Sequence, residues 1–114
     1  MMFDWNAYRK QLGQRIGEIA KLSPETVAAY RGLNQAGNKT DLLGARTREL
    51  IALAVAVTRQ CDGCIAVHSE AALKQGATRE EIAEALGVAI AVNAGAALVY
   101  SSRVMDAVSD AVSE

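Results

Sequence analysis

Apolar residues recur along the chain at spacings of three and four, which is the pattern of amphipathic helices. Near the N-terminus this spacing places five residues on one helical face: Trp5, Tyr8, Leu12, Ile16 and Ile19. No stretch shows the clean alternation of apolar and polar residues that is typical of a half-buried strand. The pattern therefore predicts an all-α protein.

A start signal marks the second predicted helix. Ser23 is a favoured N-cap residue, and Pro24 fits the first helical turn because its missing N–H has no partner there in any case. We expect this helix to end near Gln35, because Gly37 and Asn38 follow.

A third segment spans residues 45–59 and contains the wholly apolar run 50–57. Periodicity alone cannot separate a buried strand from a buried helix in such a run. We interpret it as a helix, because the run lies inside a longer uninterrupted segment and no partner strand is apparent elsewhere in the sequence.

The fourth helix is predicted from about Cys61 to Gln75, where Gly76 is a natural residue to end it. Thr78 and Glu81 then form a T-x-x-E capping box, which opens a fifth helix.

The apolar C-terminal part is predicted to contain one interruption. We expect a break or kink at residues 93–95, an asparagine–alanine–glycine step, and a last helix over 98–112. These elements make about six helices in one compact all-α domain spanning residues 1–114.

Composition and charge exclude several classes of partner. Among 114 residues, 12 basic and 13 acidic side chains leave a net charge of −1. A chain this close to neutral offers no electrostatic surface for nucleic acid or anionic lipid, and an aromatic content of 4% argues against base stacking. We therefore expect neither nucleic acid nor membrane as a partner.

The most apolar stretch is Ala85–Tyr100. It is 16 residues long, whereas a membrane span needs about 20 predominantly apolar residues. The N-terminal region is charged from Asp4 onward and contains no signal-peptide core. These features predict a cytoplasmic protein whose apolar stretch packs in the core or between the subunits of a homo-oligomer.

Candidate chemistry comes from the two cysteines and the single histidine, Cys61, Cys64 and His68. Their i, i+3, i+7 spacing places them on one helical face. Cys61 lies near the helix start, where unpaired N–H groups favour a thiolate. A C-x-x-C pair there allows one thiol to resolve the oxidation product of the other, and His68 can accept a proton from Cys64.

Glu49 lies on the preceding predicted helix. If the chain reverses near Gln60, Glu49 lies 11 residues before the turn and His68 lies 8 after it. Their mismatch along the helix axes is then only about 4–5 Å. A carboxylate beside the imidazole would fix its tautomer and raise its basicity. We therefore predict a carboxylate–imidazole–thiol relay that activates Cys64 as a nucleophile.

Two other interpretations of these residues are open. The thiols can be buried and inert, or Glu49, Cys61, Cys64 and His68 can serve as four zinc ligands. Zinc would prefer a second C-x-x-C or a further histidine, and the sequence has neither. We expect no metal and, since no G-x-G-x-x-G motif follows a strand, no bound cofactor.

The segment from Arg48 to about Val108 resembles the carboxymuconolactone decarboxylase superfamily, in its alkylhydroperoxidase D-like branch. The resemblance rests on the string E-x11-C-x-x-C-x-x-x-H, followed by A-x-x-x-G-A-T-x-E-E-I-x-E-A. It implies an all-helical family domain with its core at about residues 45–110. It also implies homo-oligomers, with a hexamer favoured and a trimer as the other possibility.

The same resemblance implies a thiol-dependent alkyl hydroperoxide reductase or a related thiol–disulfide oxidoreductase. By match, Cys64 attacks the hydroperoxide, Cys61 resolves the product, and His68 with Glu49 forms the proton relay. An external dithiol would then restore the pair. Gly63 stands where the characterised peroxidase has an extra histidine, and this chain lacks the long N-terminal half of that enzyme.

Two alternative functions remain as hypotheses. The first is a lactone enzyme of the decarboxylase kind, in which His68 donates a proton. The decarboxylase branch uses histidines and lacks the cysteine pair, so the C-x-x-C motif argues against it here. The second is a non-enzymatic oligomer whose disulfide state alters its assembly.

Overall fold

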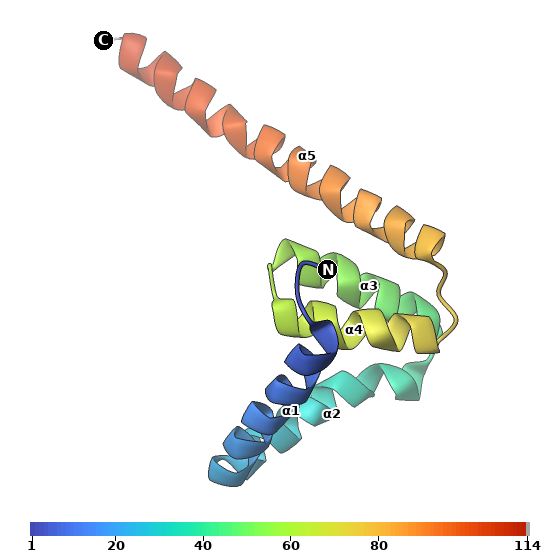
Figure 1. The fold of residues 1–114 in the computed structure, drawn as a ribbon. Coiled ribbons are helices and arrows are strands. Elements are labelled where there is room, and N and C mark those ends of the chain that lie inside the picture. Colours follow the sequence, from blue (N-terminus) through green and yellow to red (C-terminus); the bar gives the residue numbers. More distant parts are fainter. Residues whose placement is uncertain (114) are drawn as a thin grey trace.

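The computed structural model describes residues 1–113, and these residues form five α-helices and no strand (Figure 1). The helices are α1 (Trp5–Leu22), α2 (Pro24–Thr40), α3 (Ala45–Thr58), α4 (Asp62–Lys74) and α5 (Arg79–Val112). The prediction of an all-α fold is confirmed, including the helical interpretation of the apolar run 50–57.

The centre of the molecule is a hairpin of α3 and α4, which run antiparallel side by side (Figure 1). The chain reverses where predicted, at Gln60, whose φ of 52° lies in the left-handed region. Helix α5 packs against the α3 side of this hairpin. Helix α1 packs against α4 and also against α2, so the hairpin is covered from two directions.

The connection from α4 to α5 follows its predicted signals. Gly76 takes a φ of 86°, which ends α4 in a conformation that favours glycine. The capping box is complete: the Glu81 amide donates to Thr78 Oγ1 over 3.0 Å, and the Thr78 amide donates to Glu81 Oε1 over 2.9 Å. These bonds satisfy backbone donors that the start of a helix otherwise leaves open.

Helix α2 does not end near Gln35, and that prediction is wrong, because contacts with α3 extend the helix through Gly37 and Asn38. The Arg48 side chain lies across Gly37, where a Cβ would stand 2.8 Å from Arg48 Cδ. Arg48 also donates to Asn38 Oδ1 over 3.0 Å and to Asp41 Oδ1 over 2.7 Å. The glycine therefore leaves room for the Arg48 side chain and does not end the helix.

Helix α5 is continuous over 34 residues, so the break predicted at residues 93–95 is wrong, and five helices replace about six. The Asn93 side chain donates to the carbonyl oxygen of Ala89 over 2.7 Å and to Thr58 Oγ1 of α3 over 2.9 Å. Asparagine is thereby accommodated within the helix. A single glycine, Gly95, costs a helix only about 1 kcal/mol relative to alanine, which is too little to break it.

The single chain is open, so the prediction of a compact domain is wrong for the isolated chain. Its radius of gyration is 19.0 Å, against about 13 Å for a compact domain of similar length. The buried hydrophobic residues are mostly alanines: Val27, Leu53, Ala56, Ala66, Ala72, Ala77 and Ala89. Small residues allow the helices to approach closely, but they leave the larger apolar side chains outside.

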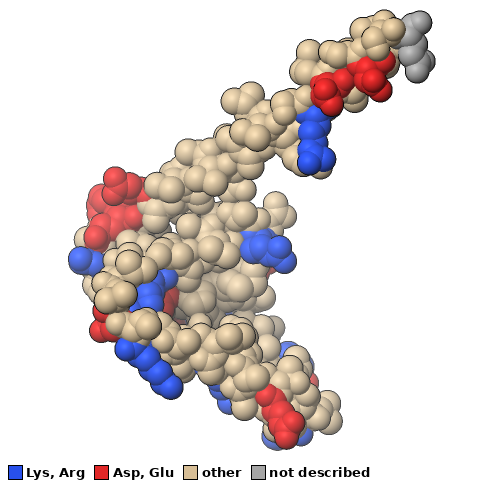
Figure 2. All heavy atoms as spheres, turned by 180° about the vertical axis from the view of Figure 1, so that it is seen from behind, with Lys and Arg blue, Asp and Glu red and all other residues tan. Residues whose placement is uncertain are grey.

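Helix α5 carries much of this exposed apolar surface. No charged side chain occurs between residues 85 and 102, and Figure 2 shows this uncharged length between an acidic start and a charged end. By length and composition alone α5 could cross a membrane, a test that core helices of soluble proteins also pass. Only 6% of its most apolar window is buried. The stretch Ala85–Tyr100 is thus largely exposed in the single chain, with Ala89 as its buried residue.

Candidate active site

The two cysteines lie at the N-terminal end of α4 and are joined in a disulfide. Cys61 is the N-cap residue, and its sulfur accepts a hydrogen bond from the Cys64 amide over 3.2 Å. Both residues are half-buried. The sulfurs therefore lie where the helix dipole stabilises negative charge, as a reactive thiolate needs.

Glu49 of α3 and His68 of α4 are hydrogen-bonded across the hairpin, with 2.7 Å between Glu49 Oε2 and His68 Nδ1. Their side chains are 24% and 17% exposed. The carboxylate favours the tautomer that carries its proton on Nδ1, which leaves Nε2 as the acceptor of a neutral imidazole. The proximity of Glu49 and His68 that the residue spacing predicted is thus present.

The order of groups along α4 completes the arrangement. His68 follows Cys64 by four residues and Cys61 by seven, so all three lie on successive turns of one helical face. The structure therefore brings all four predicted site residues to the α3–α4 hairpin. Their catalytic roles remain predictions.

A polar pocket of about 260 Å³ adjoins the Glu49–His68 pair, where α2 meets the hairpin. Its walls include side chains that the sequence analysis did not single out: Asn34, Gln35, Asn38, Arg48 and Gln75. The pocket gives His68 a hydrogen-bonding environment on the α2 side. No local motif marks these residues, because they meet only where α2 faces the α3–α4 hairpin across the pocket.

Gly63, between the two cysteines, is covered by α1. A Cβ built on Gly63 would lie 3.1 Å from Leu12 Cδ2 and 3.9 Å from Tyr8 Oη. A side chain at this position would require the Leu12 side chain of α1 to shift by a few tenths of an ångström. The glycine that distinguishes this chain's C-x-x-C motif therefore has a packing reason, which the sequence alone did not reveal.

Within residues 1–113, no group of three or more histidine, cysteine or acidic side chains is placed to hold an ion. The cysteines are bonded to each other, and Glu49 bonds His68.

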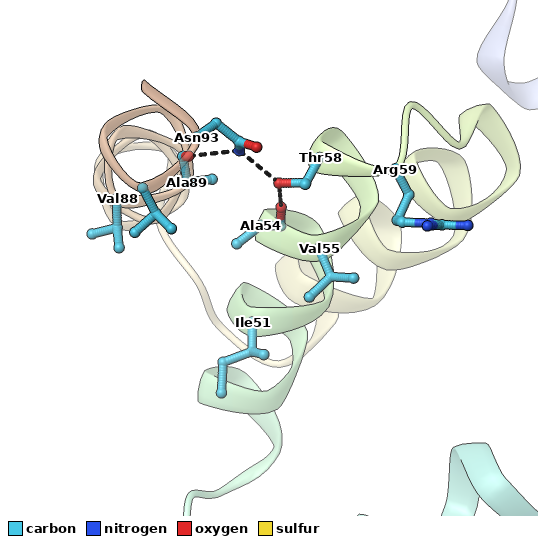
Figure 3. Close-up of a pocket in the computed structure, with 9 residues that line it drawn as sticks. Ile51, Ala54, Val55, Thr58, Arg59, Val88, Ala89 and Asn93 are labelled. Carbon is cyan, nitrogen blue, oxygen red and sulfur yellow. Dashed lines mark hydrogen bonds between the residues drawn. The ribbon is translucent and has the colours of Figure 1, made fainter. Parts of the chain in front are cut away.

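A second pocket, of about 320 Å³, lies between α3 and α5 (Figure 3). Its walls are almost wholly apolar and include Ile51, Val55, Val88 and Val92. At one edge the Asn93 amide reaches across to Thr58, whose hydroxyl donates to the carbonyl oxygen of Ala54 over 2.9 Å. None of the four predicted site residues lines this groove.

Comparison with known families gives a match over most of the chain. The model of the carboxymuconolactone decarboxylase family matches residues 24–107. A carboxymuconolactone decarboxylase family protein from Legionella pneumophila, crystallised in its apo form, has a similar fold. The TM-score is 0.74 at 38% sequence identity, over 86% of this chain and 88% of that one.

Relatives of nearly the same length are described as uncharacterized proteins. One from Haemophilus influenzae is 47% identical over 109 residues, covering 96% of each chain. One from Cupriavidus necator is 32% identical over 105 residues, covering 92% of this chain and 93% of its own. A protein described as uncharacterized protein 4 in the cox locus of Paracoccus denitrificans is 36% identical over 90 residues, covering 79% and 81%.

Proposed function

The chain belongs to the carboxymuconolactone decarboxylase family, and on that premise we propose that it is a thiol-dependent alkyl hydroperoxide reductase of the alkylhydroperoxidase D-like branch. The observation that carries the proposal is the hydrogen-bonded Glu49–His68 pair one turn from Cys64, whose partner Cys61 caps the same helix. In this proposal His68 is the base, Cys64 the nucleophile and Cys61 the resolving thiol, and the proximity of Glu49 to His68 supports these roles.

The reaction begins with the reduced dithiol. His68 Nε2 takes the proton of the Cys64 thiol, and Glu49 stabilises the imidazolium that results. The thiolate attacks the terminal oxygen of a hydroperoxide, so an S–O bond forms, the O–O bond breaks and an alkoxide leaves. The alkoxide takes a proton to become an alcohol, and Cys64 is left as a sulfenic acid.

Resolution uses the second thiol. Cys61 attacks the Cys64 sulfenic sulfur, the S–S bond forms and water leaves. An external dithiol then reduces the Cys61–Cys64 disulfide by two successive exchange steps and is itself oxidised to a disulfide. The proposed reaction requires no flavin, haem or metal, and its partners are the hydroperoxide and that dithiol.

A thiol count tests the proposal. Reduced protein is treated with one equivalent of tert-butyl hydroperoxide, alkylated and weighed intact. We expect both thiols to disappear together in the native chain and a sulfenic acid to be trapped on Cys64 in Cys61→Ser. We expect the thiol of Cys64→Ser to persist. Survival of both native thiols would overturn the proposal.

We further propose that the protein works in the cytoplasm as a homo-oligomer, a hexamer in preference to a trimer, with α5 packed against other copies. The support is the length of exposed apolar surface on α5, including Leu98 at 75% and Val99 at 73% exposed. A monomer in light scattering at micromolar concentration, or partition of the protein into the membrane fraction, would contradict this assembly.

A further inference from the structure

The polar pocket beside the Glu49–His68 pair differs in character from the other cavity of the molecule. It has a volume of about 260 Å³, and both residues of the pair line it. The apolar groove between α3 and α5 is larger, but the pair and both cysteines lie outside its walls. A molecule that binds beside His68 therefore meets hydrogen-bonding side chains rather than an apolar surface.

The pocket lies within a short distance of Cys64 along α4. Cys64 and His68 stand four residues apart on one face of this helix, which separates their Cα atoms by about 6 Å along the helix axis. About four single bonds of about 1.5 Å each cover that distance. A hydroperoxide whose O–O bond lies at the Cys64 sulfur can therefore extend a substituent of a few atoms past His68 into the pocket.

The wall that α2 contributes to the pocket is held by Arg48 of α3. Its guanidinium donates to Asn38 Oδ1 over 3.0 Å and to Asp41 Oδ1 over 2.7 Å. The Asn38 amide in turn donates to Gln35 Oε1 over 2.8 Å. Within residues 1–113, the two Arg48 bonds are the side-chain hydrogen bonds that join the α2 segment to the hairpin. These side chains thus shape the pocket, and their polar groups are already engaged with one another.

Asn34 of α2 and Gln75 at the end of α4 differ from these residues. Both line the pocket and are exposed to solvent. Neither side chain takes part in a hydrogen bond found within residues 1–113. Each side-chain amide offers two N–H donors and one carbonyl acceptor. Two walls of the pocket therefore present hydrogen-bonding groups to a molecule that enters it.

The charge and the size of the pocket restrict what fits there. Its charged groups are paired, because Arg48 bonds Asp41 and Glu49 bonds His68. A neutral polar group therefore fits better than an ionic one, which would lose water without gaining a free counter-charge. The volume lies below the range of about 300–1,000 Å³ that is typical of pockets for drug-sized ligands. An alkyl chain would strip water from the amides without replacing their hydrogen bonds.

We infer that the hydroperoxide substrates of this protein carry a short, neutral, hydrogen-bonding substituent, an inference that rests on the proposed peroxidase function. The substituent binds in the polar pocket between Asn34 and Gln75, while the O–O bond lies at Cys64. A hydroxyl or carbonyl group on the substituent then exchanges hydrogen bonds with the two amides. Asn34 and Gln75 are thus specificity-determining residues, and the substrate class is small polar hydroperoxides rather than long-chain alkyl ones.

A matched pair of oxidants tests this assignment. One is tert-butyl hydroperoxide, and the other is its analogue in which one methyl group carries a hydroxyl. Each rate of single-turnover thiol oxidation is divided by the rate of free dithiothreitol with the same oxidant, which removes the intrinsic reactivity of the oxidant. By these normalised rates, the native protein should prefer the hydroxylated compound about fivefold, the scale of one hydrogen bond.

Variants of the two amides locate the origin of this preference. Asn34→Leu combined with Gln75→Leu replaces both amides with apolar side chains of similar size, and this double variant should react with both oxidants at equal normalised rates. Gln14→Leu, at an exposed site on α1 outside the pocket, is the matched control and should keep the preference. The two rates are measured on one preparation, so a partly misfolded fraction cancels from their ratio.

The outcomes separate this inference from the proposed function. Equal normalised rates in the native protein overturn the substrate assignment and leave the peroxidase proposal intact. A preference that persists in the double variant overturns the binding role of Asn34 and Gln75. Native thiols that survive both oxidants overturn the peroxidase proposal itself, and the substrate assignment with it.

Discussion

The α3–α4 hairpin and helix α5 differ in how far a single chain satisfies their side chains. The hairpin holds the four candidate site residues and satisfies their polar groups internally, with Glu49 bonded to His68 and Cys61 capping α4. Helix α5 spans 34 residues, and in its second half no residue is buried. One chain therefore brings the candidate site residues together, whereas the apolar surface of α5 stays exposed to solvent.

The energetic difference follows from burial. In the hairpin, Leu53 and Ala72 are at most 5% exposed, whereas Leu98 and Met105 on α5 are 75% and 65% exposed. Burying a large apolar side chain is worth about 1.5–3 kcal/mol. In the proposed oligomer, covering several such residues with a second copy would therefore stabilise the protein by more than most single contacts inside the hairpin.

The largest expected effect comes from charging α5. Leu98 and Met105 are seven residues apart and share one helical face, so Leu98→Glu with Met105→Glu should convert the oligomer to a monomer at about 10 μM, since two isolated charges would otherwise be buried. Size-exclusion chromatography with light scattering measures this. Arg103→Glu, on another face of α5, is the control and should leave the oligomer intact.

The same monomeric variant also tests whether the hairpin reacts with a hydroperoxide without a second copy. If the hairpin is self-contained, the variant should still lose both thiols to one equivalent of tert-butyl hydroperoxide. Thiols that become inert on dissociation would mean that a second copy completes the site.

The next effect concerns the hairpin alone. Glu49→Gln replaces the carboxylate that orients and polarises His68, and removal of such a partner typically costs 10–100-fold in activity. We expect thiol oxidation by tert-butyl hydroperoxide to slow by about that factor, with the oligomer unchanged. Glu84→Gln, an exposed site on α5, removes the same charge as a control. Equal rates in both variants would remove Glu49 from the relay.

A smaller effect is expected from the packing of α1 over Gly63 of α4. Glycine-to-alanine changes inside helices normally stabilise by about 1 kcal/mol. Gly13→Ala on α1 should show this gain in urea unfolding, because nothing lies within 4 Å of the new Cβ. Gly63→Ala should gain less or lose stability, because its Cβ meets Leu12 Cδ2 at 3.1 Å. Equal gains in the free energy of unfolding would mean that α1 and Leu12 shift away from the new methyl group at no energetic cost.

The smallest effect lies at the joint between the two regions. The Thr78 backbone hydrogen bond lowers the pKa of Glu81, and Arg46 of α3, 3.8 Å away, adds to this. The carboxylate therefore contributes stability above the ordinary glutamate pKa of 4.5, and this contribution is lost as pH falls through the lowered value. The urea midpoint of the native chain should exceed that of Glu81→Gln at pH 7, and the gap should close as the pH falls below 4.5 and through the lowered pKa of Glu81. A constant gap contradicts this linkage.

Local signals predicted the central part of the molecule well. The reversal at Gln60, the capping box at Thr78 and the meeting of Glu49 with His68 each depend on residues close in sequence or on one helical register. Such features follow from helix geometry, so spacing alone sufficed.

The remaining features depend on side chains distant in sequence. Asn93 stays within α5 with the help of Thr58, and α2 passes Gly37 because Arg48 lies against it. The contact of Tyr8 with the turn at Gly63 likewise joins the first helix to the fourth. No motif encodes these contacts, and the open shape of the single chain leaves apolar surface on α5 that the proposed oligomer would cover.

The unbroken length of α5 also has a mechanical meaning. A helix of 34 residues is about 51 Å long, and its contacts with α3 extend to Asn93, whose side chain bonds Thr58. The part beyond Asn93, about 28 Å long, extends from α3 as a stiff arm. A change of about 10° in how the first half of α5 packs on α3 would move the far end by about 5 Å, which is roughly one helical turn. The packing of a few residues on α3 thus sets the alignment of surface carried far from them.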